Sequence, residues 1–158
     1  MRTILSNKYL LLFLRVALGS IFIFSAVMKI IDTTYFVKSL ENYKLLPVES
    51  LNIFALVIPC LELIIGILLL LGIFVKEGAL IGSIMMTVFI AAILIALERG
   101  LDIECGCFGT ADGSRVGLIK IIEDFFLLGG FIWLTITGSD YFAILKENKT
   151  EPDHPIPF

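Results

Sequence analysis

Two cysteines one residue apart are the side chains of this sequence best suited to redox chemistry. Cys105 and Cys107 flank Gly106, and residues at this spacing can reach the Cα separation of about 4.4 to 6.8 Å that a disulfide needs. Gly106 relaxes the backbone between them, and Gly109 lets the chain turn away. A disulfide in so small a ring is strained, and strained, exposed disulfides exchange most readily. The sequence therefore predicts a redox-active pair, with Phe108 beside it at the membrane interface.

Two other roles for these thiols stay open. The disulfide could be a structural clasp, or the two thiolates could hold a soft metal ion such as Cu(I). The metal site is disfavoured because the sequence has one histidine, His154, and it lies in the C-terminal tail. Acidic neighbours, Asp102 and Glu104 among them, disfavour the thiolate, which favours a pair that a partner attacks.

Cys60 is a third thiol in a different setting. On a helical wheel it points away from Glu62, off the side expected to face the protein interior. We interpret it as a small apolar side chain, since buried cysteines usually behave that way. A role as a resolving thiol toward Cys105 or Cys107 is the alternative.

Long apolar segments surround the cysteine pair. Hydrophobic residues make up 58% of the 158 residues, and they gather in four runs at about residues 9–31, 53–74, 79–97 and 116–136. A run of about 20 apolar residues spans a bilayer as a helix, and the sequence lacks the alternation of a barrel strand. We predict an all-α, integral membrane four-helix bundle over residues 1–145. Residues 146–158, a polar tail with three prolines, are expected to be disordered.

The orientation follows from charges and thiols together. With the N- and C-termini cytoplasmic, five Lys or Arg residues lie inside and four lie in the outer loops. Paired cysteines persist as disulfides in oxidising compartments, which also puts the Cys105 segment outside. The prediction is a multi-pass protein of a bacterial inner membrane, surrounded by lipid, with the cysteines on the periplasmic side. The net charge of −3 and the absence of a basic block give no sign of nucleic-acid binding.

The sequence also predicts the structure of two connections between the spans. Phe36, Leu40 and Tyr43 follow helical spacing in the first outer loop, and Pro47 ends the pattern. This predicts a short interfacial helix that roofs the bundle, with an ordinary amphipathic connector as the alternative. Residues 75–78 are predicted to form a tight turn between the second and third spans.

Five charged residues fall within or beside the spans: Arg15, Lys29, Glu62, Glu123 and Asp124. A charge at mid-bilayer costs at least about 2.5 to 3.5 kcal/mol, so each should face a partner or water. Depths counted at about 1.5 Å per residue pair Arg15 with Glu62, and Lys29 with Glu123 or Asp124. These pairs either hold the helices in register or make a polar pocket in which Glu62 carries protons.

Two helical stripes contain these charges and are predicted to face inward, with small residues allowing close helix approach. They are Arg15, Gly19, Phe22, Ala26 and Lys29 in the first span, and Pro59, Glu62, Gly66 and Leu69 in the second.

With these residues described, the chain resembles the MauE/DoxX-like family of small four-helix membrane proteins, in particular its methylamine-utilisation MauE branch. The most specific part of the likeness is the segment Cys105-Gly106-Cys107-Phe108-Gly109. The other matching residues are Leu14, Arg15, Gly19, Lys29, Phe36, Tyr43, Pro59, Glu62, Gly66, Gly72, Arg99 and Gly100, and Glu123-Asp124 stand where the family carries an acidic pair or Arg-Asp.

The resemblance implies a membrane thiol–disulfide redox accessory protein. MauE-like proteins are thought to assist disulfide formation in secreted proteins beside a periplasmic thioredoxin-fold protein, and DoxX relatives are associated with quinone-linked complexes. Four-helix disulfide-generating membrane enzymes suggest a membrane quinone as a further station, although they use other cysteine spacings. The rival hypothesis is a non-enzymatic membrane subunit, a scaffold or a binder of lipid or a hydrophobic solute, with a structural disulfide.

Overall fold

The computed structural model describes residues 8–45, 47–100 and 118–137, and all its regular elements are helices. The fold is therefore all-α over these residues, as predicted. The helices are α2 (Lys8–Ile31), α3 (Thr33–Asn42), α4 (Val48–Leu71), α5 (Val75–Glu98) and α6 (Leu118–Thr137).

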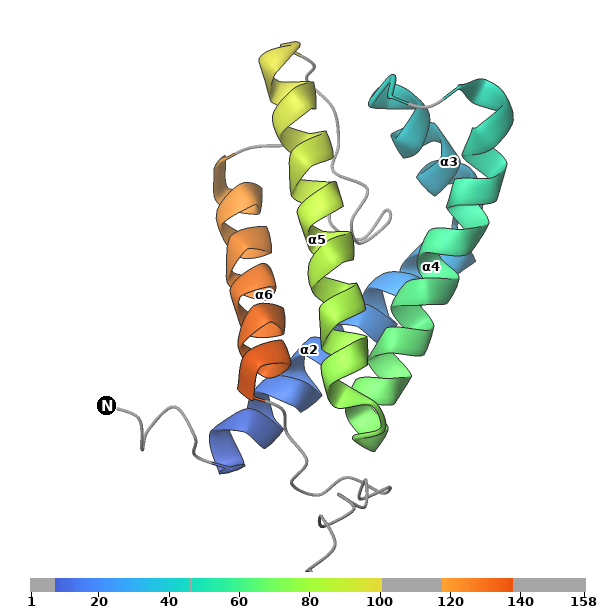
Figure 1. Ribbon diagram of the computed structural model, residues 1–158. Helices are drawn as coiled ribbons and strands as arrows, with labels where there is room; N and C mark the ends of the chain where they lie inside the picture. Colours follow the sequence, from blue (N-terminus) through green and yellow to red (C-terminus); the bar gives the residue numbers. More distant parts are fainter. Residues whose placement is uncertain (1–7, 46, 101–117, 138–158) are drawn as a thin grey trace, which may run out of the picture.

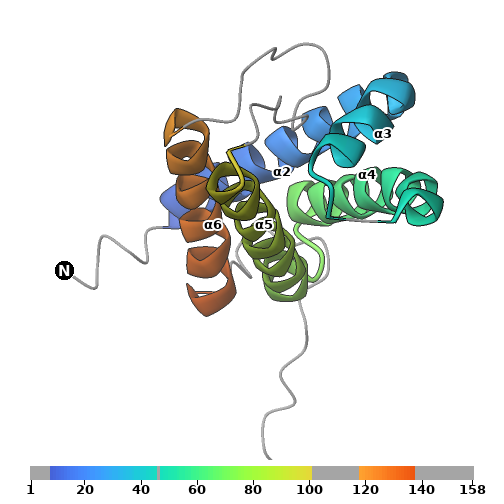
Figure 2. The ribbon, with the colours of Figure 1, turned by 90° about the horizontal axis from the view of Figure 1, so that it is seen from above.

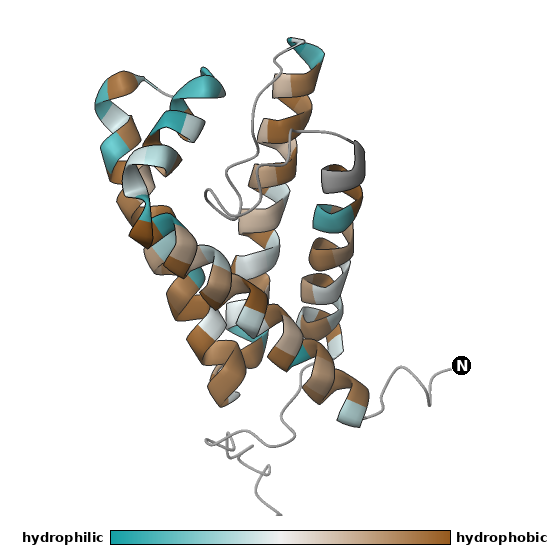
Figure 3. Ribbon diagram, turned by 180° about the vertical axis from the view of Figure 1, so that it is seen from behind, coloured by the Kyte–Doolittle hydropathy of each residue, from teal (hydrophilic) through white to brown (hydrophobic). Residues whose placement is uncertain are grey.

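Three of the helices are long and apolar enough to cross a membrane. The candidate spans are Tyr9–Ile31, Val48–Leu71 and Val75–Glu98, of 23, 24 and 24 residues. Figure 3 shows apolar residues along the length of these helices and hydrophilic residues gathered around α3. The chain is a multi-pass membrane protein by this criterion. Helix α6 has 20 residues and carries Lys120, Glu123 and Asp124 in its first two turns, so a fourth crossing stays a prediction.

The helices associate as two pairs. Helix α2 packs along α4, and α5 packs along α6 (Figures 1 and 2). A short turn joins α4 to α5, and from that turn the two helices diverge (Figure 1). The two pairs thus stay close at one end of the bundle and separate toward the end where α3 lies.

The turn between α4 and α5 comes earlier than predicted. Helix α4 ends at Leu71, and Gly72 caps it in the left-handed conformation (φ 73°) that glycine adopts without steric cost. Phe74 is also left-handed (φ 49°), and α5 begins at Val75. Residues 75–78 therefore form the first turn of α5 and not the connection. Buried Val75 and Gly78 hold that turn against the bundle.

The connection between the first two candidate spans is shorter than the sequence indicates. Helix α4 begins at Val48, not at residue 53, and Pro47 occupies its N-cap with φ −65°. Proline suits this position because its missing N–H has no partner within a helix start.

The predicted short helix is present as α3. The Asp32 side chain caps it by accepting a hydrogen bond from the Tyr35 N–H at 3.0 Å. The helix ends at Asn42, before Pro47, because Lys44 takes a left-handed conformation (φ 50°).

Tyr43, directly after α3, ties this helix to the far pair. Its side chain is 5% exposed and clusters with Ile93 and Ala96 of α5 and Ile121 of α6. Helix α3 also contacts α2 and α4. Helix α3 therefore packs on the α2–α4 pair, and Tyr43 at its end reaches the α5–α6 pair.

Two glycines bring α2 and α4 into backbone contact, as predicted from their stripes. A Cβ atom built on Gly66 would lie 2.8 Å from the Gly19 carbonyl oxygen and 2.7 Å from Cγ1 of Ile23. In the other pair, Gly82 of α5 lies under the fully buried ring of Phe131 of α6. Small residues thus set the spacing within both helix pairs.

Candidate functional site

A buried ion pair links α2 to α4. Lys29 Nζ lies 2.5 Å from Oε1 of Glu62, and the Ser25 hydroxyl donates a hydrogen bond to Oε2 of the same carboxylate at 3.2 Å. Ser25 and Lys29 are one helical turn apart, so both face Glu62. The two charged side chains are almost fully buried, at 4% and 10% exposed. Burial without these partners would cost several kcal/mol, so the three groups belong together.

The pairing differs from the one predicted. The ion partner of Glu62 is Lys29. The sequence instead predicted Arg15 as the partner of Glu62, and Glu123 or Asp124 as the partner of Lys29. The depth count assumed that α2 and the second span reach the same outer level. In the structure α4 starts five residues earlier, at Val48 rather than residue 53, and its first turns pack beside α3. The first turns of α4 thus extend past the C-terminal end of α2, and Glu62 lies level with Ser25 and Lys29.

The other charged residues singled out from the sequence differ in burial. Arg15 on α2 and Asp124 on α6 are each 3% exposed, whereas Glu123, grouped with them from the sequence, is exposed. Lys29 also lies over the ring of Phe36, with Nζ 5.2 Å from the ring centroid. The two inward stripes are confirmed, since every member is buried.

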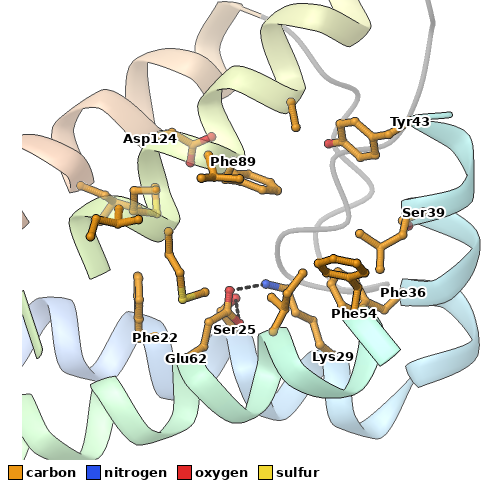
Figure 4. Close-up of a pocket in the computed structure, with 18 of the residues that line it drawn as sticks. Phe22, Ser25, Lys29, Phe36, Ser39, Tyr43, Phe54, Glu62, Phe89 and Asp124 are labelled. Carbon is orange, nitrogen blue, oxygen red and sulfur yellow. Dashed lines mark hydrogen bonds and ion pairs between the residues drawn. The ribbon is translucent and has the colours of Figure 1, made fainter. Parts of the chain in front are cut away.

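A pocket of about 360 Å³ opens beside the ion pair. All five described helices or their caps contribute to its wall. Figure 4 shows Lys29 and Glu62 on one side of the pocket, with Asp124 and Tyr43 across from them. The polar side chains in its lining are Ser25, Lys29, Ser39, Tyr43, Glu62 and Asp124.

The rest of the lining is apolar and rich in aromatic rings. Four phenylalanines contribute to it: Phe22, Phe36, Phe54 and Phe89. Between the diverging helices α4 and α5, some lining residues are also exposed on the outer surface of the bundle. Phe54, Ile84 and Val88 are 40%, 56% and 65% exposed and lie within candidate spans. The pocket therefore reaches the surface that faces lipid.

Tyr43 contributes a neutral hydroxyl to the pocket. Burial, and then the negative charge of Asp124, raise the pKa of this phenol well above its usual value. Its hydroxyl points into the pocket (Figure 4). At physiological pH Tyr43 is therefore a protonated group that can donate a hydrogen bond.

The predicted redox pair, Cys105 and Cys107, lies outside the described residues, as do Gly106, Phe108 and Gly109. Their segment connects the end of α5 to the start of α6, toward the end of the bundle where α3 also lies (Figure 1). Next to the segment, Arg99 Nη1 donates a hydrogen bond to the Lys44 carbonyl oxygen at 3.3 Å.

Cys60 is described, and its side chain is an exposed free thiol on α4. It faces away from the bundle, as the helical wheel predicts. Because it lies in the middle of a candidate span, this face of α4 meets lipid.

Residues 7–137 match the model of the family described as methylamine utilisation protein MauE. This match covers most of the chain and runs through the cysteine segment. The chain belongs to the MauE family.

A curated MauE relative supports this membership. The chain is 27% identical over 115 residues to the methylamine utilization protein MauE of Paracoccus denitrificans. The matched part is 72% of this chain and 62% of that relative, so the chain spans less than two thirds of the relative's length. No solved structure matches the chain.

Some pocket residues of this MauE-family chain are not identified by the sequence analysis. Ser25 could have been identified, because it precedes Lys29 by one helical turn and therefore lies on the same side of the helix as the buried stripe. Ser39 could not, since a serine in a polar loop helix is usually exposed. Tyr43 was noticed as part of an apolar spacing, but not as a hydroxyl that faces a charge on α6.

Proposed function

We propose that the chain is a membrane component of disulfide formation in methylamine utilisation. In this proposal Cys105 and Cys107 exchange a disulfide with a periplasmic thioredoxin-fold partner. The observation that carries it is the MauE family match, which includes the cysteine segment. The Paracoccus relative is a methylamine utilization protein, and we take the physiological setting from it.

The chemistry is a thiol–disulfide exchange between two proteins. A thiolate of one protein attacks a sulfur of the other's disulfide, forming a mixed disulfide and releasing the second thiolate of that pair. The remaining thiolate of the attacking protein then breaks the mixed disulfide. One pair ends oxidised and the other reduced, so two electrons move without any further reactant.

The arrangement of the described helices supports this proposal. The segment that carries the cysteines leaves α5 and enters α6 at one end of the bundle, where α3 and the polar residues gather. The hydrogen bond from Arg99 to Lys44 holds the start of that segment to the outer loop. We place this end on the periplasmic side, consistent with the slight excess of basic residues in the opposite loops.

Trapping the mixed disulfide tests the proposal. In Cys105→Ser or Cys107→Ser, the remaining thiol cannot complete the exchange, so one of these variants should accumulate a partner through a bond that a reducing agent breaks. Cys60→Ser is the matched control and should behave like the unaltered protein. Failure of both single variants to capture any partner would overturn the exchange.

A redox titration separates exchange from a structural clasp. A clasp should resist reduction, with a potential below about −300 mV, whereas an exchanging pair should be more oxidising. The titration should be done in Cys60→Ser, so that only the Cys105–Cys107 pair is read.

A further inference from the structure

The pocket between the two helix pairs opens toward the bilayer. Phe54, Ile84 and Val88 line it, and each is exposed on a candidate span. Since lipid surrounds such spans, a molecule dissolved in the bilayer can enter between α4 and α5 without crossing water. A site reached in this way takes its ligand from the apolar molecules of the membrane.

Two apolar clusters bound the pocket. Phe22 and Met86 line it and belong to the core cluster that contains Phe131. Phe89 and Ala92 line it too, and they pack against the second cluster, the one that contains Tyr43. The pocket therefore lies between the two clusters. Its volume of about 360 Å³ is in the usual range for small-molecule sites.

One wall of this apolar pocket carries the ion pair of Lys29 and Glu62 (Figure 4). Lys29 has three N–H donors, and Glu62 takes one of them. The Glu62 carboxylate accepts one hydrogen bond on each oxygen, from Lys29 and from Ser25, although a carboxylate offers about four acceptor sites. The ion pair can therefore both donate a hydrogen bond to a ligand and accept one from it.

The charges of the ion pair favour a neutral ligand group. Lys29 and Glu62 balance each other, so a bound carboxylate or phosphate would add an uncompensated charge to a nearly water-free site. Asp124, the other acidic side chain of the lining, does not favour an anion either. A hydrocarbon has no atom that can bond to the pair. A hydroxyl group is neutral, and it accepts one hydrogen bond through its oxygen while it donates another through its proton.

We propose that this pocket binds a neutral membrane lipid with a free hydroxyl group, a long-chain alcohol or a diacylglycerol. The hydroxyl group accepts a hydrogen bond from the Lys29 ammonium and donates one to the Glu62 carboxylate. The apolar chain lies among the phenylalanine rings of the lining and passes between Phe54 and Val88 into the bilayer. This binding does not depend on the disulfide exchange proposed above.

Photo-crosslinking of the full chain in lipid nanodiscs tests the site. The probe is hexadecanol with a diazirine in its chain, and mass spectrometry identifies the labelled residues. We expect labelling of the pocket lining on α4 and α5. Unlabelled hexadecanol should compete at least about tenfold better than its methyl ether, because the ether cannot donate a hydrogen bond to the charged carboxylate. Hexadecanesulfonate, an anion of the same chain length, should also compete poorly.

Substitutions on α5 test where the probe binds. Ala92→Phe places a ring inside the pocket and should abolish the labelling of the lining that hexadecanol competes away. The matched control is Ala91→Phe, since Ala91 is the preceding residue, exposed and outside the lining. Val88→Trp at the exposed mouth should also reduce the labelling, and it keeps the test decisive if Ala92→Phe fails to fold. Unchanged labelling in the folded pocket variants would overturn the proposal.

A double substitution tests the role of the ion pair. Lys29→Met/Glu62→Met removes both charges together, so neither is left buried alone. The lining should still be labelled, but hexadecanol and its methyl ether should now compete equally well. A preference for the alcohol that survives in this variant would contradict the bridging hydroxyl. Equal competition by alcohol and ether in the unaltered protein, or stronger competition by hexadecanesulfonate, would overturn the proposal as well.

A further competitor distinguishes the two sources of the hydroxyl group. Dioleoylglycerol carries one free hydroxyl group and two chains. If it competes as well as hexadecanol, the site takes a diacylglycerol, and if it fails while hexadecanol competes, the site takes a single-chain alcohol.

Discussion

Lys29 and Glu62 form a nearly water-free ion pair between α2 and α4, with Nζ and Oε1 2.5 Å apart. We expect Lys29→Met or Glu62→Met alone to lower the free energy of unfolding by about 3 to 5 kcal/mol, since each leaves a buried charge without its counter-charge. The double variant should lose much less free energy of unfolding than the two single variants lose together. Unfolding in mixed detergent micelles, analysed as a double-mutant cycle, measures this coupling. Additive losses would show that the two charges act separately.

The backbone contact between Gly19 and Gly66 should make α4 intolerant of the smallest side chain. Gly66→Ala puts a methyl group 2.8 Å from the Gly19 carbonyl oxygen, so the helices must move apart. We expect a loss of about 1 to 3 kcal/mol in the free energy of unfolding. Gly129→Ala on α6 is the control, because a Cβ atom there meets nothing within 4 Å. The control should be neutral or slightly stabilising, and equal losses in both would argue against close packing.

The ring of Phe131 fills the space over Gly82. A methyl group in Gly82→Ala would lie 2.5 Å from this ring, which is fully buried and packs on Phe22 with 4.6 Å between centroids. We expect a loss of about 1 to 3 kcal/mol.

A second substitution checks the cause of that loss. Phe131→Leu in the same chain should recover part of the stability lost by Gly82→Ala, and thermal unfolding can compare the three variants. Gly78→Ala is the control on the same helix, because its Cβ atom has only an ordinary contact at 3.9 Å. No recovery in the double variant would contradict the proposed clash.

Tyr43 should resist ionisation in alkaline solution. Burial and the charge of Asp124 raise its pKa in the folded protein, whereas an unfolded tyrosine ionises near pH 10. The folded state then keeps a proton that the unfolded state releases, so the contribution to stability is full below about pH 10 and declines above it.

Absorbance of the phenolate band can follow this titration. Subtracting the absorbance of folded Tyr43→Phe from that of the folded unaltered protein isolates the signal of Tyr43. This signal should show little phenolate near pH 10, and the phenolate absorbance should appear when both proteins are unfolded. Asp124→Asn should move the titration partway back toward the usual value. A Tyr43 signal that titrates normally in the folded protein would contradict the burial described here.

The parts of the fold that follow from local pattern were predicted from the sequence. Apolar length places α2, α4 and α5, and helical spacing identifies the buried stripes from Arg15 to Lys29 and from Pro59 to Leu69. The orientation of Cys60 followed from the same periodicity. These features depend on one helix at a time.

The ion pair and the pocket depend on how helices sit relative to one another. The sequence pairs Glu62 with Arg15 only if the two spans end at the same level, but the first turns of α4 pack beside α3 and Glu62 pairs with Lys29. The turn lies at Gly72 to Phe74 and not at residues 75–78, because Val75 and Gly78 are buried in the first turn of α5. Their burial can be predicted only when the helices that pack against them are known. The opposed positions of Lys29 and Tyr43 likewise arise only after assembly.

The outward direction of Cys60 gives the molecule a built-in reference for chemical labelling. A bulky, membrane-impermeant maleimide should not reach this thiol, because the hydrocarbon of the bilayer surrounds its face of α4. After reduction, this reagent should therefore label only Cys105 and Cys107 of this protein in intact cells. The side of the membrane from which they are labelled shows the topology, and no substitution is needed.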